Sequence, residues 1–439
     1  IKKERKGDYL GSTVQVIPHV TDEIKHRLKH LAPDYDVIIT EIGGTVGDIE
    51  SLPFLEAIRQ FRQDEGRENV IFIHLTLVPY LTAVGELKTK PTQHSVRELM
   101  TIGIQPDVLV ARSEHPLNES LREKIALFTN VPSQAVIEAR DVSTIYQVPL
   151  ELRDQNLDDV VLQRLGLTRE PAELLEWESM VKRIIQPNLG QVKIAIVGKY
   201  TELVDAYKSI HQALIHGGIS NDVGVKMSWI SAEDYENGSS LEGLKDYDAL
   251  LIPGGFGERG VPGMLMAVEW ARENKLPFFG ICLGLQVAII EYSRNICKLT
   301  NADSMEFSDD TDQPVICLMD SQRNVTRKGG TMRLGSYPAI LAKDSKVASI
   351  YCNSEIKERH RHRYEVNNDF RTYLEEAGLS MSGTSPNGEL VEMIELKDHP
   401  WFVACQFHPE LKSRPTRPHP LFASFIEAAL KSSNRSKSE

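Results

Sequence analysis

The chain has 439 residues and a formal net charge of −12, with 62 acidic side chains against 50 lysines and arginines. This length suits two or three domains with substantial cores, and the negative charge argues against wholesale nucleic-acid binding. No apolar run approaches the roughly 20 residues that a membrane helix needs, so we expect no membrane partner. The five cysteines, from Cys282 onward, show no metal-binding spacing and favour a reduced, cytoplasmic setting.

Between residues 34 and 150, apolar strand patterns alternate with helix patterns. This alternation predicts a parallel sheet covered by helices. Pro53 falls just inside the first predicted helix, where proline is tolerated. The predicted strands are Tyr35–Thr40, Val70–Leu77, Val108–Ala111 and Ala135–Glu138, and the predicted helices are Leu52–Arg62, Ser95–Ile102 and Leu121–Phe128.

Three acidic residues follow the first predicted strand within a glycine-containing segment: Glu41, Asp48 and Glu50. Carboxylates at the carboxyl end of a strand in an open α/β sheet suit Mg²⁺ and nucleotide contacts. The same acids fit a solvated loop in which Asp48 or Ser51 caps the helix that begins at Leu52. The sequence alone leaves both interpretations open.

A second polar segment, Lys88–Gln93, places two lysines two residues apart in a predicted extended stretch. Such cations suit phosphate oxygens, although an exposed loop also explains the pattern. Farther along, residues 167–191 turn polar and irregular and are predicted to be a helix-containing linker. A second βα series then begins at Val192, and the polar tail from Lys431 is predicted to be disordered. The predicted domains are therefore 1–166 and 192–430, with the tail at 431–439.

Cys282 lies between Gly280 and Gly284, directly after a short apolar strand and before a helix pattern. This is the spacing of a nucleophile elbow, whose strained turn exposes the reactive side chain. A helix N-terminus aimed at the sulfur would lower the pKa of the thiol. A buried core cysteine is the alternative interpretation of this segment by itself.

A base and its orienting group follow a later apolar strand. His408 and Glu410 are two residues apart, so His408 can face the thiol while Glu410 holds the other side of the imidazole, as in a Cys-His-acid triad. The glycine turn after another predicted strand offers backbone N–H groups at Gly254, Gly255 and Phe256 for an oxyanion. A plain βα loop explains that turn equally well.

These motifs resemble two known protein families. Gly280–Gly284, Pro253–Gly257 and Phe407–Glu410 are similar to class I glutamine amidotransferases, which release ammonia from glutamine. Over nearly the whole chain, from Ile1 to about Ala429, the sequence also resembles the CTP synthases. The strings that carry this resemblance are Gly7–Gly11, Glu41–Ser51, Lys88–Val96 and Arg363–Asn367.

The resemblance implies a P-loop-type synthetase domain joined to a class I glutamine amidotransferase domain, both α/β, doubly wound, with mostly parallel sheets. It implies that ATP and Mg²⁺ are used to phosphorylate UTP, and that ammonia from glutamine then displaces the phosphate to give CTP. It further implies a homotetramer that GTP activates and CTP inhibits.

The resemblance also assigns roles by position. Cys282, His408 and Glu410 would be the catalytic triad, and Glu41 would hold Mg²⁺. Free glutamine carries an ammonium and a carboxylate, which Glu306 and Arg363 could pair. The remaining assignments are Gly255, Leu283, Gly284, Leu285 and Gln286 for glutamine; Asp48, Ile49, Glu50, Lys88, Thr89, Lys90, Pro91, Thr92, Gln93 and Lys124 for UTP or CTP; and Arg140, Asp141 and Val142 for ATP.

Two features depart from the family pattern. No Gly-x-x-x-x-Gly-Lys-[Ser/Thr] motif occurs, so a chain that begins at Ile1 is expected not to phosphorylate UTP. The stretch Met319–Gly330 also looks shorter than the family's loop. The alternative interpretations are another class I amidotransferase and a non-catalytic module that binds nucleotides or forms filaments. The run Arg359–Arg363 would suggest a basic patch or a metal site, but histidines two apart beside arginines are poor metal ligands.

Overall fold

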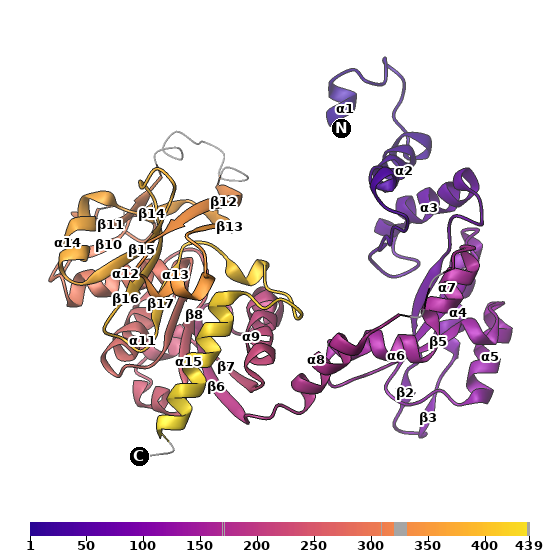
Figure 1. Cartoon of the computed structure of the whole chain (residues 1–439). Helices are drawn as coiled ribbons and strands as arrows, with labels where there is room; N and C mark the ends of the chain where they lie inside the picture. Colours follow the sequence, from indigo (N-terminus) through magenta and orange to yellow (C-terminus); the bar gives the residue numbers. More distant parts are fainter. Residues whose placement is uncertain (169, 171, 309, 320–331, 437–439) are drawn as a thin grey trace. The chain divides into compact units, whose positions relative to one another are not determined.

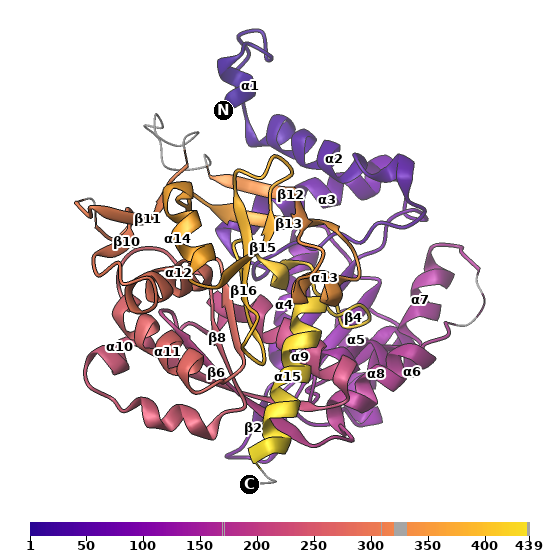
Figure 2. The ribbon, with the colours of Figure 1, turned by 60° about the vertical axis from the view of Figure 1, so that its left-hand side comes forward.

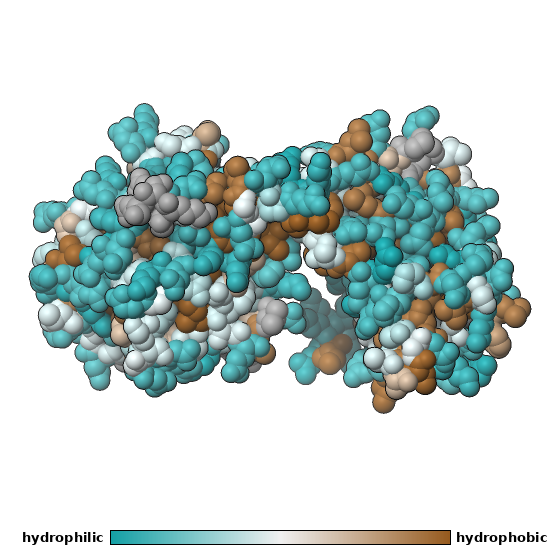
Figure 3. All heavy atoms as spheres, turned by 90° about the horizontal axis from the view of Figure 1, so that it is seen from below, coloured by the Kyte–Doolittle hydropathy of each residue, from teal (hydrophilic) through white to brown (hydrophobic). Residues whose placement is uncertain are grey.

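The computed structural model describes residues 1–168, 170, 172–308, 310–319 and 332–436. The chain divides into two compact units, an N-terminal unit (Ile1–Leu175) and a C-terminal unit (Glu176–Glu439), which are coloured along the sequence in Figure 1. On the face drawn in Figure 3, hydrophilic residues predominate and apolar residues occur in small groups. Among the described residues, no helix has both the length and the apolar character needed to cross a membrane.

The N-terminal unit is built on a three-stranded sheet in the order β1-β4-β5, and both pairs of strands are parallel. This confirms the predicted parallel sheet for three of its four predicted strands. Buried residues of β4 and β5, such as Leu109 and Ile137, join Val96 and Ile125 from the helices in one core. The strands are β1 (Ile73–Leu77), β2 (Tyr80–Leu81), β3 (Glu86–Leu87), β4 (Val108–Ser113) and β5 (Val136–Arg140); the helices are α1 (Lys2–Arg5), α2 (Thr21–Lys29), α3 (Leu52–Glu65), α4 (Lys90–Thr101), α5 (Glu119–Thr129), α6 (Val148–Asp154) and α7 (Leu157–Arg164).

The strand predicted at Tyr35–Thr40 is absent from the structure. Its apolar residues Val37 and Ile39 are exposed, Ile39 to 93%. A strand exists only when its backbone pairs with a neighbour, and within the described residues β1 pairs with β4 alone. The apolar pattern therefore identified a segment suited to a sheet without establishing a pairing partner.

Two helix ends differ from the prediction. Helix α4 begins at Lys90 rather than at Ser95, so residues 90–93 form its first turn and are not extended. Pro91 lies in that first turn, where the backbone N–H that proline lacks would have no partner within the helix. Helix α15 (Pro420–Ser436) continues past Lys431, so the predicted disorder is wrong as far as Ser436. Apolar anchors such as Phe425 hold this helix against the core.

The C-terminal unit contains a nine-stranded sheet among its described residues, in the order β13-β12-β15-β16-β17-β9-β8-β6-β7. The strands from β17 to β7 run parallel, and those from β13 to β17 are antiparallel. The strands are β6 (Gln191–Gly198), β7 (Gly224–Ser231), β8 (Ala249–Ile252), β9 (Phe278–Ile281), β12 (Arg333–Leu341), β13 (Glu355–His362), β15 (Leu379–Thr384), β16 (Val391–Leu396) and β17 (Phe402–Cys405), with β10 (Ala302–Ser304), β11 (Gln313–Leu318) and β14 (Tyr364–Val366) in a small separate sheet.

Helices cover both faces of the parallel strands, as the predicted doubly wound fold requires (Figures 1 and 2). Successive residues of one strand point to opposite faces, and Phe278 and Phe279 accordingly belong to two different apolar clusters. The first cluster includes α11 and α12, and the second includes α9 and α15. The unit's helices are α9 (Lys208–Asn221), α10 (Ala232–Glu236), α11 (Val261–Glu273), α12 (Leu283–Asn295), α13 (Lys346–Tyr351), α14 (Arg371–Glu376) and α15.

The segment predicted as a linker, 167–191, holds helix α8 (Leu175–Ile185), and the division between the two units falls at the first residue of this helix. The domain boundaries given in the sequence analysis remain predictions. The loop expected to be short, Met319–Gly330, lies almost wholly outside the described residues, which resume at residue 332.

Candidate active site

Cys282 occupies the turn between β9 and α12 in a conformation that side chains rarely adopt, with φ +54° and ψ −98°. Two glycines make this turn sterically possible. A Cβ atom on Gly284 would lie 2.3 Å from the carbonyl oxygen of Ile252, and one on Gly280 would lie 2.7 Å from the backbone of Gly284. The turn therefore has the strained geometry expected of a nucleophile elbow.

The parallel pairing of β9 with β17 brings the second part of the site to the same edge of the sheet. Ile281 is in register with Cys405, and the N–H of Cys282 donates to the carbonyl oxygen of Cys405 at 2.7 Å. Three residues beyond Cys405, Nδ1 of His408 is hydrogen-bonded to Oε1 of Glu410 at 2.7 Å, and the imidazole lies close enough to Cys282 for the sulfur to raise its pKa. The structure thus assembles the three predicted triad residues.

The protonation of His408 follows from its two neighbours. Burial lowers its pKa, but the charges of Glu410 and Cys282 and its hydrogen bonds to both raise the pKa well above the ordinary 6.5. At neutral pH this favours an imidazolium that faces the thiol on one side and a carboxylate on the other. Such an arrangement suits a nucleophilic cysteine that reacts as the thiolate.

The glycine turn after β8 passes close to Cys282 and His408. A Cβ atom on Gly254 would lie 2.9 Å from Cε1 of His408 and 3.5 Å from Cβ of Cys282, so only glycine lets the backbone approach the site this closely. The predicted oxyanion donors Gly254, Gly255 and Phe256 therefore lie in the loop that borders the thiol.

Lys199, which the sequence analysis left without a role, ties this loop down. Its Nζ donates to the carbonyl oxygens of Phe256, at 3.2 Å, and Gly257. The N–H of Gly257 donates in turn to Oε1 of Glu306 at 2.8 Å. Burial lowers the pKa of Lys199 to about 8, and the Glu306 carboxylate partly opposes this. The lysine follows a strand as part of a Gly-Lys pair, which is the signal that could have drawn attention to it.

The other predicted glutamine-binding residues lie on elements around the thiol. Glu306 is half-buried in the loop after β10, and Arg363 is half-buried between β13 and β14. The remaining candidates Leu283, Gly284, Leu285 and Gln286 form the buried first turn of α12. Of these, Gln286 turns its amide toward the carbonyl oxygen of Tyr364, at 3.3 Å.

The run Arg359–Arg363 is mostly strand β13, with alternate residues buried. His360 and His362 point inward and share a hydrogen bond of 2.9 Å. Burial, followed by the charge of Arg333, lowers the pKa of His360 to about 2 and that of His362 to about 3, so both are neutral at physiological pH. Within the described residues, no group of three or more His, Cys, Asp or Glu side chains could hold a metal ion.

In the N-terminal unit, Lys88 and Thr89 precede helix α4, and Lys90 opens it. Lys88 forms an ion pair with Glu86, and Lys124 on α5 is close enough to lower the pKa of Glu86 further, after the hydrogen bond and charge of Lys88. The structure thus brings two predicted phosphate-binding lysines near one helix N-terminus. Other predicted residues of this segment have internal partners, since Thr92 donates to the carbonyl oxygen of Leu77 and Gln93 donates to Thr89. Pro91 is exposed.

In the acidic loop, residues 41–51, some polar groups already have hydrogen-bond partners within the loop itself. Asp48 accepts a hydrogen bond from the N–H of Thr45 at 2.9 Å, and Ser51 donates to the carbonyl oxygen of Asp48, so neither side chain caps α3. Ile49 and Glu50 are exposed. Glu41, which would hold Mg²⁺, lines a cavity of about 1130 Å³ whose walls are mainly apolar.

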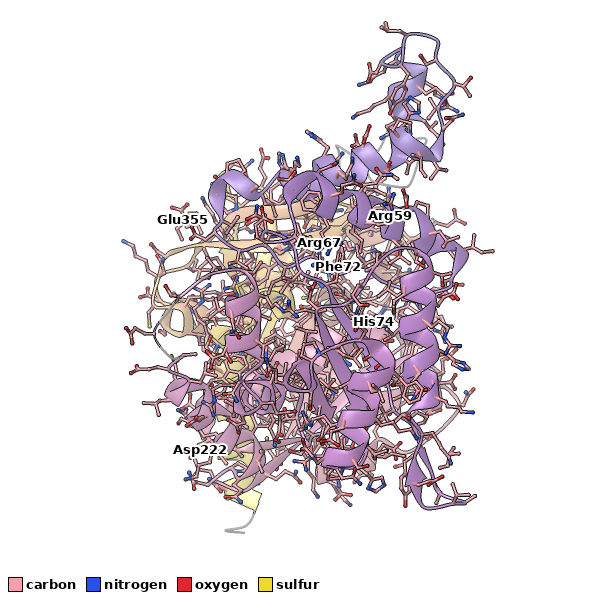
Figure 4. All side chains as sticks on the ribbon, turned by 90° about the vertical axis from the view of Figure 1, so that its right-hand side faces the viewer. Arg59, Arg67, Phe72, His74, Asp222 and Glu355 are labelled. Carbon is pink, nitrogen blue, oxygen red and sulfur yellow. The ribbon has the colours of Figure 1, made fainter. Side chains whose placement is uncertain are left out.

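The same cavity is lined by His74, whose Nε2 is 2.9 Å from Oγ of Ser95 and which Figure 4 labels beside Phe72 near the start of β1. Burial lowers the pKa of His74. The other predicted nucleotide-binding residues lie outside the residues that line this cavity. Among them, Arg140 pairs with Glu151 at 3.7 Å and Asp141 with Arg112 at 3.0 Å, while Val142 is half-buried after β5.

Comparisons with known proteins match both units. Residues 1–167 match the family model "CTP synthase N-terminus", and residues 202–428 match "Glutamine amidotransferase class-I". The chain is 56% identical to CTP synthase of Desulfitobacterium hafniense (strain Y51) and 57% identical to that of Carboxydothermus hydrogenoformans (strain ATCC BAA-161 / DSM 6008 / Z-2901). Each match covers 98% of this chain and 81% of the relative. The chain belongs to the CTP synthase family.

A solved structure agrees with this assignment. The glutaminase domain of CTP synthase from Trypanosoma brucei, with bound acivicin, is 39% identical, with a TM-score of 0.52 over 55% of this chain and 94% of that one. As a member of the CTP synthase family, the chain is a glutamine-hydrolysing ligase that converts UTP to CTP, with ATP, UTP and glutamine as substrates. The match over residues 1–167 disfavours another class I amidotransferase, which would share only the C-terminal unit.

Proposed function

We propose that Cys282, His408 and Glu410 carry out the glutaminase half of CTP synthesis. The observation that supports this most directly is the strained elbow, which sets the thiol beside a histidine already hydrogen-bonded to a carboxylate. Each residue then has a role that its contacts allow. Cys282 is the nucleophile, His408 exchanges the proton, and Glu410 orients the imidazole and stabilises its charge.

The reaction proceeds by two acyl transfers. The Cys282 sulfur attacks the side-chain amide carbon of glutamine, and the carbonyl electrons move to oxygen, where the N–H groups of the Gly254–Phe256 loop stabilise the negative charge. The tetrahedral intermediate collapses as His408 protonates the departing nitrogen, which leaves as ammonia. Water, deprotonated by His408, then hydrolyses the thioester, releasing glutamate and regenerating the thiolate.

The substrate of this unit is free glutamine, and two half-buried groups at the site match its ends. Glu306 is a partner for the α-ammonium and Arg363 for the α-carboxylate. The first turn of α12, from Leu283 to Gln286, and Gly255 would line the side-chain pocket.

In the N-terminal unit, we propose that Lys88, Lys90 and Lys124 bind the triphosphate of UTP or of the inhibitor CTP at the N-terminus of α4. The free N–H groups and the dipole of a helix N-terminus favour phosphate, and lysines add charge. Asp48, Ile49 and Glu50 would contact CTP, and residues 140–142 would contact the ATP base. ATP transfers its terminal phosphoryl group to O4 of UTP, and ammonia then displaces phosphate at C4.

Magnesium is the expected cofactor of this second step. It typically uses one or two protein carboxylates together with substrate phosphates and water, so the single carboxylate of Glu41 fits such a site although no protein-only cage is present in the described residues. When bound, Mg²⁺ would neutralise phosphate charge. We also propose, from the family resemblance, activation by GTP, a homotetramer and a cytoplasmic location, with which five free thiols are compatible.

The test separates the two half-reactions. In the full-length enzyme, Cys282→Ala should abolish CTP formation from glutamine but retain formation from added ammonium, because ammonia bypasses the glutaminase. Cys297→Ala removes another, half-buried thiol and should retain both activities. Equal loss of both activities in Cys282→Ala would contradict the assignment of this thiol to the glutaminase alone.

A further inference from the structure

The first residue after β17, Gln406, has no part in the mechanism above. Gln406 is fully buried, and its backbone N–H donates to the carbonyl oxygen of Glu392 on β16 at 2.9 Å. Its side chain turns toward the elbow, where Nε2 lies 3.6 Å from Sγ of Cys282. A buried amide at this distance is within hydrogen-bonding range of a sulfur, which is larger and softer than oxygen.

A chain of hydrogen bonds fixes which end of this amide faces the sulfur. The carbonyl oxygen of Tyr364 can only accept, so the Gln286 amide must present its NH₂ group there, at 3.3 Å. The same NH₂ group lies 3.2 Å from the Gln406 side chain, which must therefore present its oxygen. With its oxygen held by Gln286, Gln406 has only its NH₂ group left to face Cys282.

We propose that the Gln406 side-chain amide donates a hydrogen bond to the Cys282 thiolate, locked in that orientation by Gln286 and the Tyr364 carbonyl. This rests on the proposed role of Cys282 as nucleophile. The backbone carbonyl of Tyr364 is always a hydrogen-bond acceptor. The relay formed by this carbonyl, Gln286 and Gln406 therefore presents a donor to the sulfur throughout the catalytic cycle. His408 exchanges its proton with the substrate, whereas Gln406 stays neutral and stabilises the anionic form of the sulfur.

The physical effect of such a donor is to favour the ionised thiol. Cys282 is 4% exposed, so few water molecules can solvate its negative charge, and each protein donor counts for more than in solution. A hydrogen bond to a charged group contributes enough to shift a proton equilibrium by about one pH unit. The titratable groups around the sulfur and the amide include His408 with Glu410, and the adjacent Cys405 on β17, which itself lies near Glu358 and Glu392.

The test measures the ionisation of Cys282 itself. Iodoacetamide reacts with thiolates, and the tryptic peptide Leu276–Arg294 contains Cys282 as its only cysteine, so mass spectrometry can follow its alkylation between pH 5 and 10. Gln406→Met retains the length of the side chain without a donor and should move the midpoint of this profile up by about one pH unit. Gln406→Glu replaces the donor with an acceptor and should move it farther in the same direction.

Two controls separate this role from a structural one. Cys405→Ala truncates the adjacent buried side chain and leaves the relay intact, so it should keep the wild-type midpoint even if its melting temperature falls. Gln286→Leu releases the Gln406 amide to rotate and should raise the midpoint by less than Gln406→Met does. An unchanged midpoint in Gln406→Met, with cooperative melting retained, would overturn the proposal.

The result also distinguishes failure of this inference from failure of the proposed function. If Cys282 were not the nucleophile, Cys282→Ala would retain glutaminase activity. If only the relay were wrong, Cys282→Ala would be inactive while Gln406→Met kept the wild-type profile.

Discussion

At the scale of single residues, the site contains groups in states that would be unfavourable without their neighbours. Cys282 is held at a positive φ, and the pKa of the His408 imidazole is raised despite its burial, by Glu410 first and then by Cys282. Each of these states is costly in isolation and is stabilised by its neighbours. Glu410 lies 2.7 Å from Nδ1 of His408, so a substitution at Glu410 can test the protonation of this histidine while leaving Cys282 unchanged.

We predict that Glu410→Gln lowers glutamine hydrolysis by about 10²–10⁴-fold, because the imidazolium loses its charged partner while the shape of the side chain is kept. The substitution should lower the pKa of His408, shifting the pH–rate profile measured by glutamate release. A histidine whose pKa is raised on folding stabilises the protein below about pH 6.5, and this stabilisation fades as pH rises through the folded pKa. The loss of stability in Glu410→Gln should therefore be larger at pH 6 than at pH 9.

The exposed Glu427, paired with Lys431 on α15, offers a matched control. Glu427→Gln should change neither glutamine hydrolysis nor the pH profile. A wild-type rate in Glu410→Gln would rule out Glu410 as the orienting group of His408.

Residue types and spacing were sufficient to select three residues that the structure brings together, because a glycine-flanked cysteine and a His-x-Glu pair are local patterns. Gln406 and Lys199 were missed, although Gln406 directly precedes the Phe407–Glu410 motif and Lys199 follows the strand that opens the second βα series. Their functions depend on what they touch, namely a sulfur 124 positions away and carbonyl groups 57 and 58 positions away. Such contacts are properties of the folded sheet and leave no periodic signal in the sequence.

At the scale of elements, a buried arginine joins three strands of the C-terminal unit. Arg333 on β12 donates to Glu392 on β16 at 2.7 Å and to Glu365 on β14 at 3.2 Å, and all three side chains are buried. Burial, with the charge of Glu392 added at Glu365, raises the pKa of both carboxyl groups against the opposing effect of Arg333. One guanidinium thus compensates two carboxylates that belong to different strands.

Removing that guanidinium should strongly destabilise the C-terminal unit. We predict that Arg333→Met lowers the free energy of unfolding by about 3–5 kcal/mol, since it leaves buried carboxylates without a cation. Because carboxyl groups with a raised pKa bind protons more tightly in the folded state, stability falls as pH rises above about 4.5. The deficit of the variant in urea unfolding should therefore be smaller at pH 5 than at pH 8.

The outward-facing Arg361 on neighbouring β13 provides the comparison, because it is exposed. Arg361→Met should stay within about 0.5 kcal/mol of wild type at both pH values. Equal destabilisation by the two substitutions would show that the buried network is not responsible.

The elements themselves were predicted with uneven success, for a physical reason. Strands β4 and β5 are buried apolar runs with parallel neighbours, and their existence follows from composition. The segment at residues 35–40 has the same composition but lacks a pairing partner in the described residues, and forms no strand. Helix α4 begins before the segment in which its apolar residues recur with helical spacing. Its first turn contains proline and polar residues, which a helix start tolerates but which a search for apolar periodicity does not detect.

At the scale of the whole molecule, the two half-reactions belong to units with separate cores. The large apolar clusters of the C-terminal unit draw on residues from Val192 to Ala429, whereas those of the N-terminal unit lie before residue 161. Covalent linkage of two such units raises the effective concentration of one beside the other. The linkage matters here because ammonia released into neutral water becomes ammonium and loses its nucleophilic lone pair.

Separate cores predict separate folding. A fragment of residues 176–439 should unfold in a single cooperative transition, because its nine-stranded sheet and both covering helix layers lie within those residues. In this fragment iodoacetamide should still alkylate Cys282 with the pH midpoint of the full-length protein, since the groups that we place around the sulfur, from the β8 loop to Glu410, are all present. Calorimetry and the Leu276–Arg294 peptide supply the two measurements.

A fragment that melts without a cooperative transition would show that its core needs the N-terminal unit. A cooperative fragment with a shifted midpoint would show that the N-terminal unit instead tunes the nucleophile, and so would locate the coupling between the half-reactions at Cys282.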